Sequence, residues 1–205
     1  MRMDESNTET VLGIIKEFAN VGAGNAATAL ASLLDMELVN EVTSCNIMPL
    51  SHIGEWLGGN DKVVAGTYTQ LCGDLRSGVL VVFPEKSAIT IVEHLAGEDA
   101  NLVDLTPIQL SALCEVGNIC LCWYLVAVSK MIDTDLIPAP PGAAVDLLGA
   151  VLDIPLAALG ASVDAVIAVH TVFKGVERSF EGYFLLLPED LMLKTVLEKV
   201  GDTLI

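Results

Sequence analysis

A glutamate and an asparagine three positions apart occur twice in this sequence of 205 residues, each time within an apolar run. The first copy is Glu17 with Asn20, and the second, 98 positions later, is Glu115 with Asn118. On a helix, residues three apart share one face, with about 5–6 Å between their β-carbons. The carboxamide can donate and accept hydrogen bonds beside the carboxylate. Packing gives no reason to repeat such a pair, so we interpret it as a duplicated polar site on a surface that meets a partner.

A second candidate is the segment Gly22-Ala-Gly-Asn-Ala-Ala27, which satisfies the G-x-G-x-x-A form of a dinucleotide fingerprint. That motif needs a preceding strand and a glycine turn that opens a helix onto the pyrophosphate. Here the preceding residues follow a helical pattern, and the corresponding stretch 120–125 contains no glycine. We therefore expect these small residues to allow close helix packing, and keep a nucleotide-binding enzyme as a third hypothesis.

Metal chemistry is poorly supported by the cysteines and histidines. They are scattered and include no Cys-x-x-Cys pair: Cys45, Cys72, Cys114, Cys120, Cys122, His52, His94 and His170. A zinc site needs clustered ligands. We expect no metal or cofactor bound by this chain, and buried, reduced thiols.

Composition limits the class of protein. Apolar residues make up 53% of the chain and charged residues 18%, which excludes disorder. The net charge of −17 argues against binding to nucleic acid and to anionic membrane surfaces. The longest apolar run, Ile119 to Val128, is shorter than the roughly 20 residues needed to cross a bilayer. With no secretory leader at its start, the chain is expected to be cytoplasmic, without membrane insertion.

Two long helices are expected to carry the repeated pair. The first should begin near Ser6, with Glu9 completing a capping box. The second has a stronger start signal, with Thr106 as N-cap, Pro107 at the first helical position and Gln109 as the capping-box partner.

The repetition extends beyond these helices. Gly78 to Glu85 matches Gly182 to Glu189 at an offset of 104, each an apolar strand ended by proline. A short helix should follow each strand, 88–95 ending at Gly97 and 191–200 ending at Gly201. We therefore predict a single domain over residues 1–205, built from two repeats at about 6–100 and about 104–205.

Short strands are expected between these landmarks: 38–42, 45–49, 63–70, 75–82, 145–152, 163–173 and 180–187. Strands in succession, bracketed by helices, predict an α/β layered fold: an internally duplicated pseudo-twofold unit with a mainly antiparallel sheet covered by helices. Residues 137–142 read as an irregular connection. The segment 143–159 fits either a helix or a strand.

At the repeated pair the chain resembles the CheC/FliY/CheX family of chemotaxis phosphatases, and CheC most. The family signature is Asp or Ser, three residues, Glu, two residues, Asn, then a proline 23 positions beyond. The second copy matches fully, with Ser111 and Pro141 completing Glu115 and Asn118. The first copy keeps Glu17 and Asn20 but has Gly13 and Thr43 at the other two positions. The resemblance spans essentially the whole chain.

The resemblance implies hydrolysis of the aspartyl phosphate on a CheY-like response regulator. Asn118 or Asn20 would orient water in line with the phosphorus, while Glu115 or Glu17 would pair with a lysine of the receiver. Mg²⁺ would be carried by the response regulator, and Ser111 and Pro141 would support the local geometry. The alternative is a non-catalytic adaptor, a binding module for CheD or for the flagellar switch.

Overall fold

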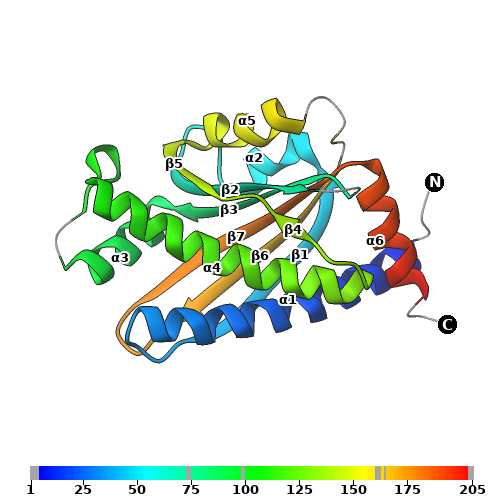
Figure 1. Ribbon diagram of the computed structural model, residues 1–205, viewed down its shortest axis with the longest axis horizontal. Coiled ribbons are helices and arrows are strands. Elements are labelled where there is room, and N and C mark those ends of the chain that lie inside the picture. Colours follow the sequence, from blue (N-terminus) through cyan, green and yellow to red (C-terminus); the bar gives the residue numbers. More distant parts are fainter. Residues whose placement is uncertain (1–4, 73–74, 98–99, 160–162, 164, 203–205) are drawn as a thin grey trace.

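One seven-stranded sheet lies between two layers of helices in the computed structural model of this chain (Figure 1). The structure describes all residues except 1–4, 73–74, 98–99, 160–162, 164 and 203–205. The larger elements of the first half are α1 (Glu5–Leu33), β1 (Val39–Pro49), α2 (Ile53–Trp56), β2 (Val63–Cys72), β3 (Ser77–Pro84) and α3 (Glu85–Ala96). Those of the second half are α4 (Pro107–Ile132), β4 (Ile137–Pro138), β5 (Gly142–Leu147), α5 (Leu148–Leu159), β6 (Ala165–Lys174), β7 (Ser179–Pro188) and α6 (Asp190–Asp202).

The sheet is symmetric about its centre. Its strands follow the order β1-β6-β7-β3-β2-β4, with β5 also paired to β2, and every pairing is antiparallel. Exchanging the first and second halves of the chain reverses this order and leaves it otherwise unchanged. The strands β2 and β6 also have the same ten-residue pattern of burial. The expected pseudo-twofold, mainly antiparallel α/β fold is therefore confirmed.

The strand register fixes which residues of the two halves are equivalent. Thr67 pairs with Val81, and its counterpart Val169 pairs with Phe184. Val81 and Phe184 also pair with each other, so the pseudo-twofold axis passes through this pair. Each residue of β3 therefore corresponds to the residue of β7 that lies 103 positions later. The offset of 104 that we took from the matching prolines is wrong by one. A slip of one residue would turn every side chain to the opposite face.

Each face of the sheet has its own core. The larger core joins one face to α1, α3, α4 and α6, through residues such as Leu30, Ile91, Leu121 and Val196. The smaller core lies on the other face, where Ile53 of α2 and Val151 of α5 are buried. Figure 1 shows α1 and α4 side by side, running in opposite directions. The two helices that carry the repeated pair thus share one layer.

Most predicted elements are present, with several corrections. The capping box at Thr106 and Gln109 is confirmed, whereas the side chains of Ser6 and Glu9 lie outside the described residues. The two strands expected over 38–49 form one strand, β1, with a register shift between Val42 and Ser44. Gly97 ends α3 in a left-handed conformation, but α6 continues through Gly201.

The segment after α4 also differs from expectation. The connection 137–142 contains the short strand β4, which pairs with the end of β2. The segment 143–159 is neither wholly helix nor wholly strand, because β5 ends at Leu147 and α5 starts at Leu148. The predicted strand over 145–152 is therefore wrong for residues 148–152, which are helical. The division into repeats at 6–100 and 104–205 stays a prediction.

Among the described residues, the helix α4 is long and apolar enough to cross a membrane by length and composition alone. Its apolar side chains pack instead against α1, α3 and the sheet, with Leu113, Val116 and Leu121 almost fully buried. This packing is that of a core helix.

Candidate functional site

The second Glu-x-x-Asn pair lies on the outer face of α4. Glu115 is exposed and Asn118 is half-buried, while Val116 and Gly117 between them face the core. Ser111 is exposed one turn before Glu115, so it extends the same face. Within the part of the chain that the structure describes, the carboxylate of Glu115 forms no ion pair. The carboxylate of Glu115 is therefore available to an external partner, and the half-buried carboxamide of Asn118 lies beside it on the same face.

Gly117 lets α4 lie directly on β2 beneath this pair. A β-carbon on Gly117 would come within 2.5 Å of Cβ and 2.1 Å of Oγ1 of Thr67, a buried residue of β2. Real β-carbons do not approach so closely, so any other residue would force the helix away from the sheet. The equivalent residue of α1 is Ala19, which is buried but keeps its β-carbon. The second site therefore lies over a helix–strand contact that only glycine permits, whereas the first site lies over an alanine.

Two thiols flank the second site. Cys114 adjoins Glu115, and Cys122 donates a hydrogen bond to Oδ1 of Asn118 at 3.4 Å. Burial, and then the charge of Glu115, raises the pKa of both thiols, which keeps them protonated near neutral pH. The corresponding residues at the first site are Lys16 and Gly24. The expectation of buried thiols holds for Cys120 but is wrong for Cys72, which is exposed.

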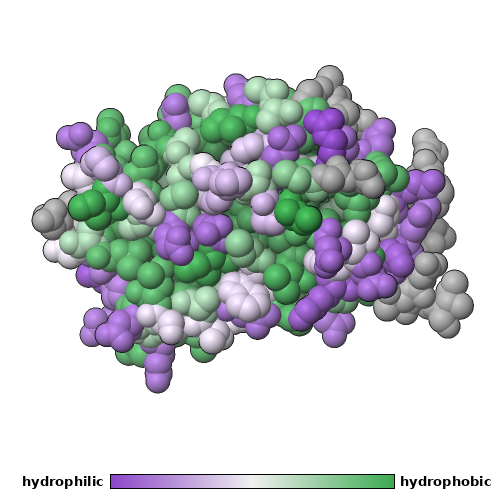
Figure 2. Space-filling view, in the orientation of Figure 1, coloured by the Kyte–Doolittle hydropathy of each residue, from purple (hydrophilic) through white to green (hydrophobic). Residues whose placement is uncertain are grey.

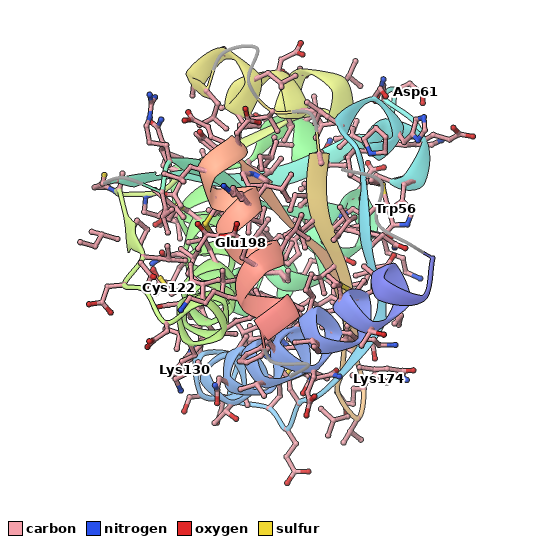
Figure 3. All side chains as sticks on the ribbon, turned by 90° about the vertical axis from the view of Figure 1, so that its right-hand side faces the viewer. Trp56, Asp61, Cys122, Lys130, Lys174 and Glu198 are labelled. Carbon is pink, nitrogen blue, oxygen red and sulfur yellow. The ribbon has the colours of Figure 1, made fainter. Side chains whose placement is uncertain are left out.

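A surface groove runs along α4 from this site toward the C-terminal end of the helix. It is lined by Cys122, Leu125, Val126, Ser129, Lys130, Asp135, Leu136 and Pro138. In Figure 3, Cys122 and Lys130 lie on the same side of the molecule, opposite Trp56 and Lys174. Figure 2 shows hydrophobic and hydrophilic residues interspersed over the face that α1 and α4 form. The site thus adjoins a groove with a mixed lining.

The first pair lies on α1, where Glu17 and Asn20 are both exposed. In the described part of the chain neither side chain has an ion-pair or hydrogen-bond partner. Two residues after Asn20, Gly22 packs against α4. A β-carbon on Gly22 would lie 3.2 Å from the backbone oxygen of Trp123 and 3.3 Å from Cα of Tyr124. Because α1 and α4 are antiparallel, the two Glu-x-x-Asn pairs lie on opposite sides of this contact between the helices. They are two separate sites on one helical layer.

The contact between α1 and α4 also explains the small residues of the segment 22–27. Residues 22–27 lie in the middle of α1, preceded by helix from Glu5 onward, and Gly22, Ala23 and Ala26 are buried against the core. This geometry contradicts a dinucleotide fingerprint and agrees with close helix packing. Among the described residues no group of three or more potential metal ligands is found. The expectation that the chain holds no cofactor or metal of its own stays a prediction.

The first and second halves also differ at Thr43 and Pro141, which the strand pairing makes equivalent. Ser44 pairs with His170, and Gly142 pairs with Tyr68. His170 and Tyr68 are counterparts in β6 and β2. Ser44 therefore corresponds to Gly142, and Thr43 to Pro141. Pro141 stands between β4 and β5, where the edge strand is interrupted. Its neighbour Ala139 is held on β2 by a backbone hydrogen bond to Gln70 of 2.9 Å. The signature proline therefore marks a break in the strand beside the second site.

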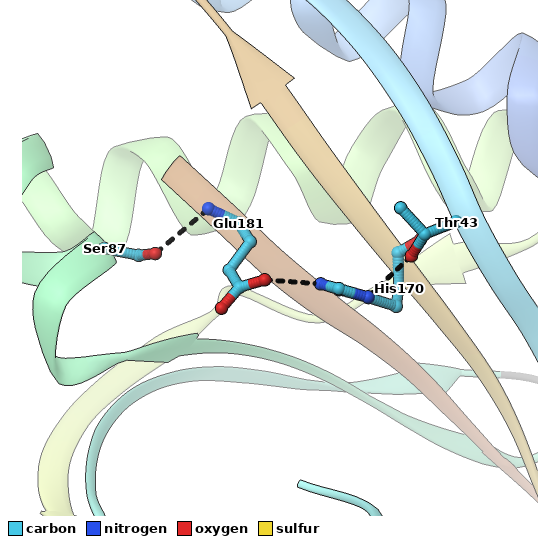
Figure 4. Close-up of polar contacts among 4 residues, drawn as sticks. All are labelled: Thr43, Ser87, His170 and Glu181. Carbon is cyan, nitrogen blue, oxygen red and sulfur yellow. Dashed lines mark hydrogen bonds and ion pairs between the residues drawn. The ribbon is translucent and has the colours of Figure 1, made fainter. Parts of the chain in front are cut away.

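Thr43 instead lies at the bulge of the continuous strand β1, in a polar chain that crosses three strands (Figure 4). Its Oγ1 is 2.6 Å from Nδ1 of His170, and Nε2 of His170 donates to Glu181 at 2.7 Å. The backbone N–H of Glu181 donates to Oγ of Ser87 at 3.0 Å. His170 also stacks on Tyr183, which packs against the smaller core. Thr43 is therefore tied to the sheet face away from α1.

Sequence reasoning missed two residues of the second site. Gly117 lies between Glu115 and Asn118, and a glycine inside a long apolar helix is a signal of close packing. Cys122 was visible only as a residue one turn after Asn118. The supporting roles expected of Ser111 and Pro141 stay predictions.

Sequence comparisons with known proteins bear on the family resemblance. No protein-family model matches the chain. The chain is 29% identical over 186 residues to the CheY-P phosphatase CheC of Bacillus subtilis (strain 168), covering 88% of this chain and 89% of that protein. This similarity confirms the resemblance to the CheC/FliY/CheX family.

Solved structures share the fold at low sequence identity. FliY of Thermotoga maritima matches with a TM-score of 0.73 and 15% identity, over 98% of this chain and 99% of that one. The FliM middle domain from H. pylori matches with a TM-score of 0.61 and 12% identity, over 96% and 99% of the two chains. The chain therefore shares its fold with FliY and with the FliM middle domain.

Proposed function

We propose that this protein is a cytoplasmic chemotaxis phosphatase that hydrolyses the aspartyl phosphate of a CheY-like response regulator. The observation that carries the proposal is the pair Glu115 and Asn118, on the outer face of a helix whose opposite face is buried in the core. The similarity to CheC over most of the chain supports the choice of substrate class.

The phosphorylated receiver is taken to supply the reacting phosphoryl group, its Mg²⁺ and a lysine. Asn118 would accept a hydrogen bond from the attacking water and donate another from Nδ2, which holds the water in line with the phosphorus. Glu115 would pair with the receiver lysine and so align α4 with the receiver's active site. No covalent intermediate on this chain is required. A rate increase of about 100-fold corresponds to only ~2.7 kcal/mol, which positioning can supply.

The first pair is proposed as a second, weaker site. Glu17 and Asn20 have the same spacing as the second pair and are both exposed, but Lys16 adds a positive charge beside Glu17, where the receiver lysine would bind. Like charges that meet at an interface weaken association. Hydrolysis is therefore expected to depend mainly on Asn118 and less on Asn20.

The decisive experiment follows the decay of a phosphorylated CheY-like receiver with the parent protein and with Asn118→Ala, Asn20→Ala and the double variant. Asn118→Ala should remove most of the added hydrolysis, Asn20→Ala a smaller part, and the double variant nearly all of it. Equal decay with the parent and the double variant would contradict the proposal.

The alternative is a non-catalytic binding module for CheD or the flagellar switch. It is favoured by the shared fold with a FliM middle domain, and a chain in a FliG–FliM complex from H. pylori also matches with a TM-score of 0.65. Pull-down experiments with CheD and with flagellar switch proteins, run beside the decay assay, separate the two functions. Binding without hydrolysis would favour the adaptor.

A further inference from the structure

The hydrogen bond between Cys122 and Asn118 links the proposed water-positioning residue to a residue outside the family signature. Cys122 lies one helical turn after Asn118, and side chains on a helix lean toward its N-terminus. This direction brings Sγ of Cys122 over the carboxamide, 3.4 Å from Oδ1. The raised pKa of the thiol keeps it protonated, so it acts as the donor in this contact.

We propose that Cys122 is a positioning residue that fixes the orientation of the Asn118 carboxamide. The thiol occupies one lone pair of Oδ1, which leaves the second lone pair and both Nδ2–H groups for water and the phosphoryl oxygens. An amide that is already oriented loses less rotational freedom in the transition state, which raises the turnover rate without changing receiver binding. This inference rests on the proposed function.

The first site provides a natural comparison, because Gly24 stands where Cys122 stands in the second half. Gly24 has no side chain that could donate to the carboxamide of Asn20, which makes no hydrogen bond among the described residues. There is room for a side chain at this position. A β-carbon on Gly24 would meet only Oδ1 of Asn40, at an ordinary contact distance of 3.6 Å.

The kinetic test isolates each site in turn. In an Asn20→Ala background, Cys122→Ala should lower kcat for receiver dephosphorylation about two- to fivefold with KM unchanged, the size expected for one weak hydrogen bond. Cys122→Ser, which retains a donor, should restore kcat to within about twofold of its background. In an Asn118→Ala background, Gly24→Cys should raise kcat about two- to fivefold above the matched control Gly24→Ala. A change confined to KM, or equal kcat for Gly24→Cys and Gly24→Ala, would overturn the proposal.

A structural readout tests the inference even if no hydrolysis is found. In the unliganded protein, the side-chain amide of Asn118 should have a higher NMR order parameter than that of Asn20. Cys122→Ala should lower the order parameter of Asn118 toward that of Asn20, and Cys122→Ser should restore it. An unchanged order parameter in Cys122→Ala would overturn the role of Cys122. The failure of the proposed function is seen separately, as equal receiver decay with the parent and the Asn20→Ala/Asn118→Ala variant.

Discussion

The two halves of this molecule carry the same Glu-x-x-Asn pair in different surroundings. At the first site, a continuous edge strand packs along α1, and Lys16 and Gly24 flank the pair. At the second, the edge strand is broken between β4 and β5, a groove opens along α4, and two thiols flank the pair. The comparison shows that two chemically equal motifs can differ through the packing and hydrogen bonds around them.

The largest effect should come from filling the contact beneath the second site. Gly117→Ala would place a β-carbon 2.5 Å from Cβ of Thr67, and overpacking of this kind costs about 1–3 kcal/mol. Helix propensity alone would instead favour alanine by about 1 kcal/mol. We expect steric strain to prevail, so that urea unfolding shows lower stability and Asn118-dependent hydrolysis falls. A stabilised protein with full activity would show that close packing does not distinguish the second site.

The next largest effect should come from removing a hydrogen bond in the polar chain that starts at Thr43. Thr43→Val keeps the shape of the side chain but removes the hydrogen bond to His170, a loss of about 1 kcal/mol in the free energy of unfolding. Hydrolysis through Asn118 should stay unchanged, because Thr43 belongs to the other half. Denaturant unfolding and the receiver decay assay measure the two quantities. Loss of Asn118-dependent hydrolysis would mean that the halves are coupled.

A smaller effect is expected at Gly13, the first-site counterpart of Ser111. A β-carbon there meets nothing within 4 Å, so Gly13→Ala should stabilise the protein by up to about 1 kcal/mol and Gly13→Ser by about half as much. In an Asn118→Ala background, Gly13→Ser should nevertheless give faster receiver decay than Gly13→Ala, because only serine restores the signature. Equal decay rates would remove Ser111 from the list of supporting residues.

The smallest effect concerns the ion pair between Glu41 and Lys174, which joins β1 to β6 at the intact edge. The hydrogen bond from Lys174 lowers the pKa of Glu41. The contribution of Glu41 to stability is therefore present above its unfolded-state pKa and is lost as pH falls through its lower folded-state value. Glu41→Gln should lower stability slightly at neutral pH and not at strongly acid pH, in parallel unfolding experiments. A difference that grows on acidification would contradict this sign.

Local sequence patterns are enough to place most of the elements and to reveal their duplication. The capping box at Thr106, the apolar strands and the repeated Glu-x-x-Asn pair are local patterns, and local patterns fix helix starts, strand positions and which residues share a helical face. The exposure of Glu17, Asn20 and Glu115 followed from the same reasoning. These features need no knowledge of what lies across the sheet.

The differences between the two halves depend mainly on contacts between residues that are far apart in the chain. The offset of β3 and β7 depends on cross-strand register, which a proline match cannot fix to one residue. The packing of Gly117 on Thr67 joins residues far apart in the chain, as does the link of Thr43 to His170. The contact of Cys122 with Asn118 is local in sequence, but its geometry depends on rotamers that surrounding side chains select. Long-range contacts therefore make two similar motifs into two different sites.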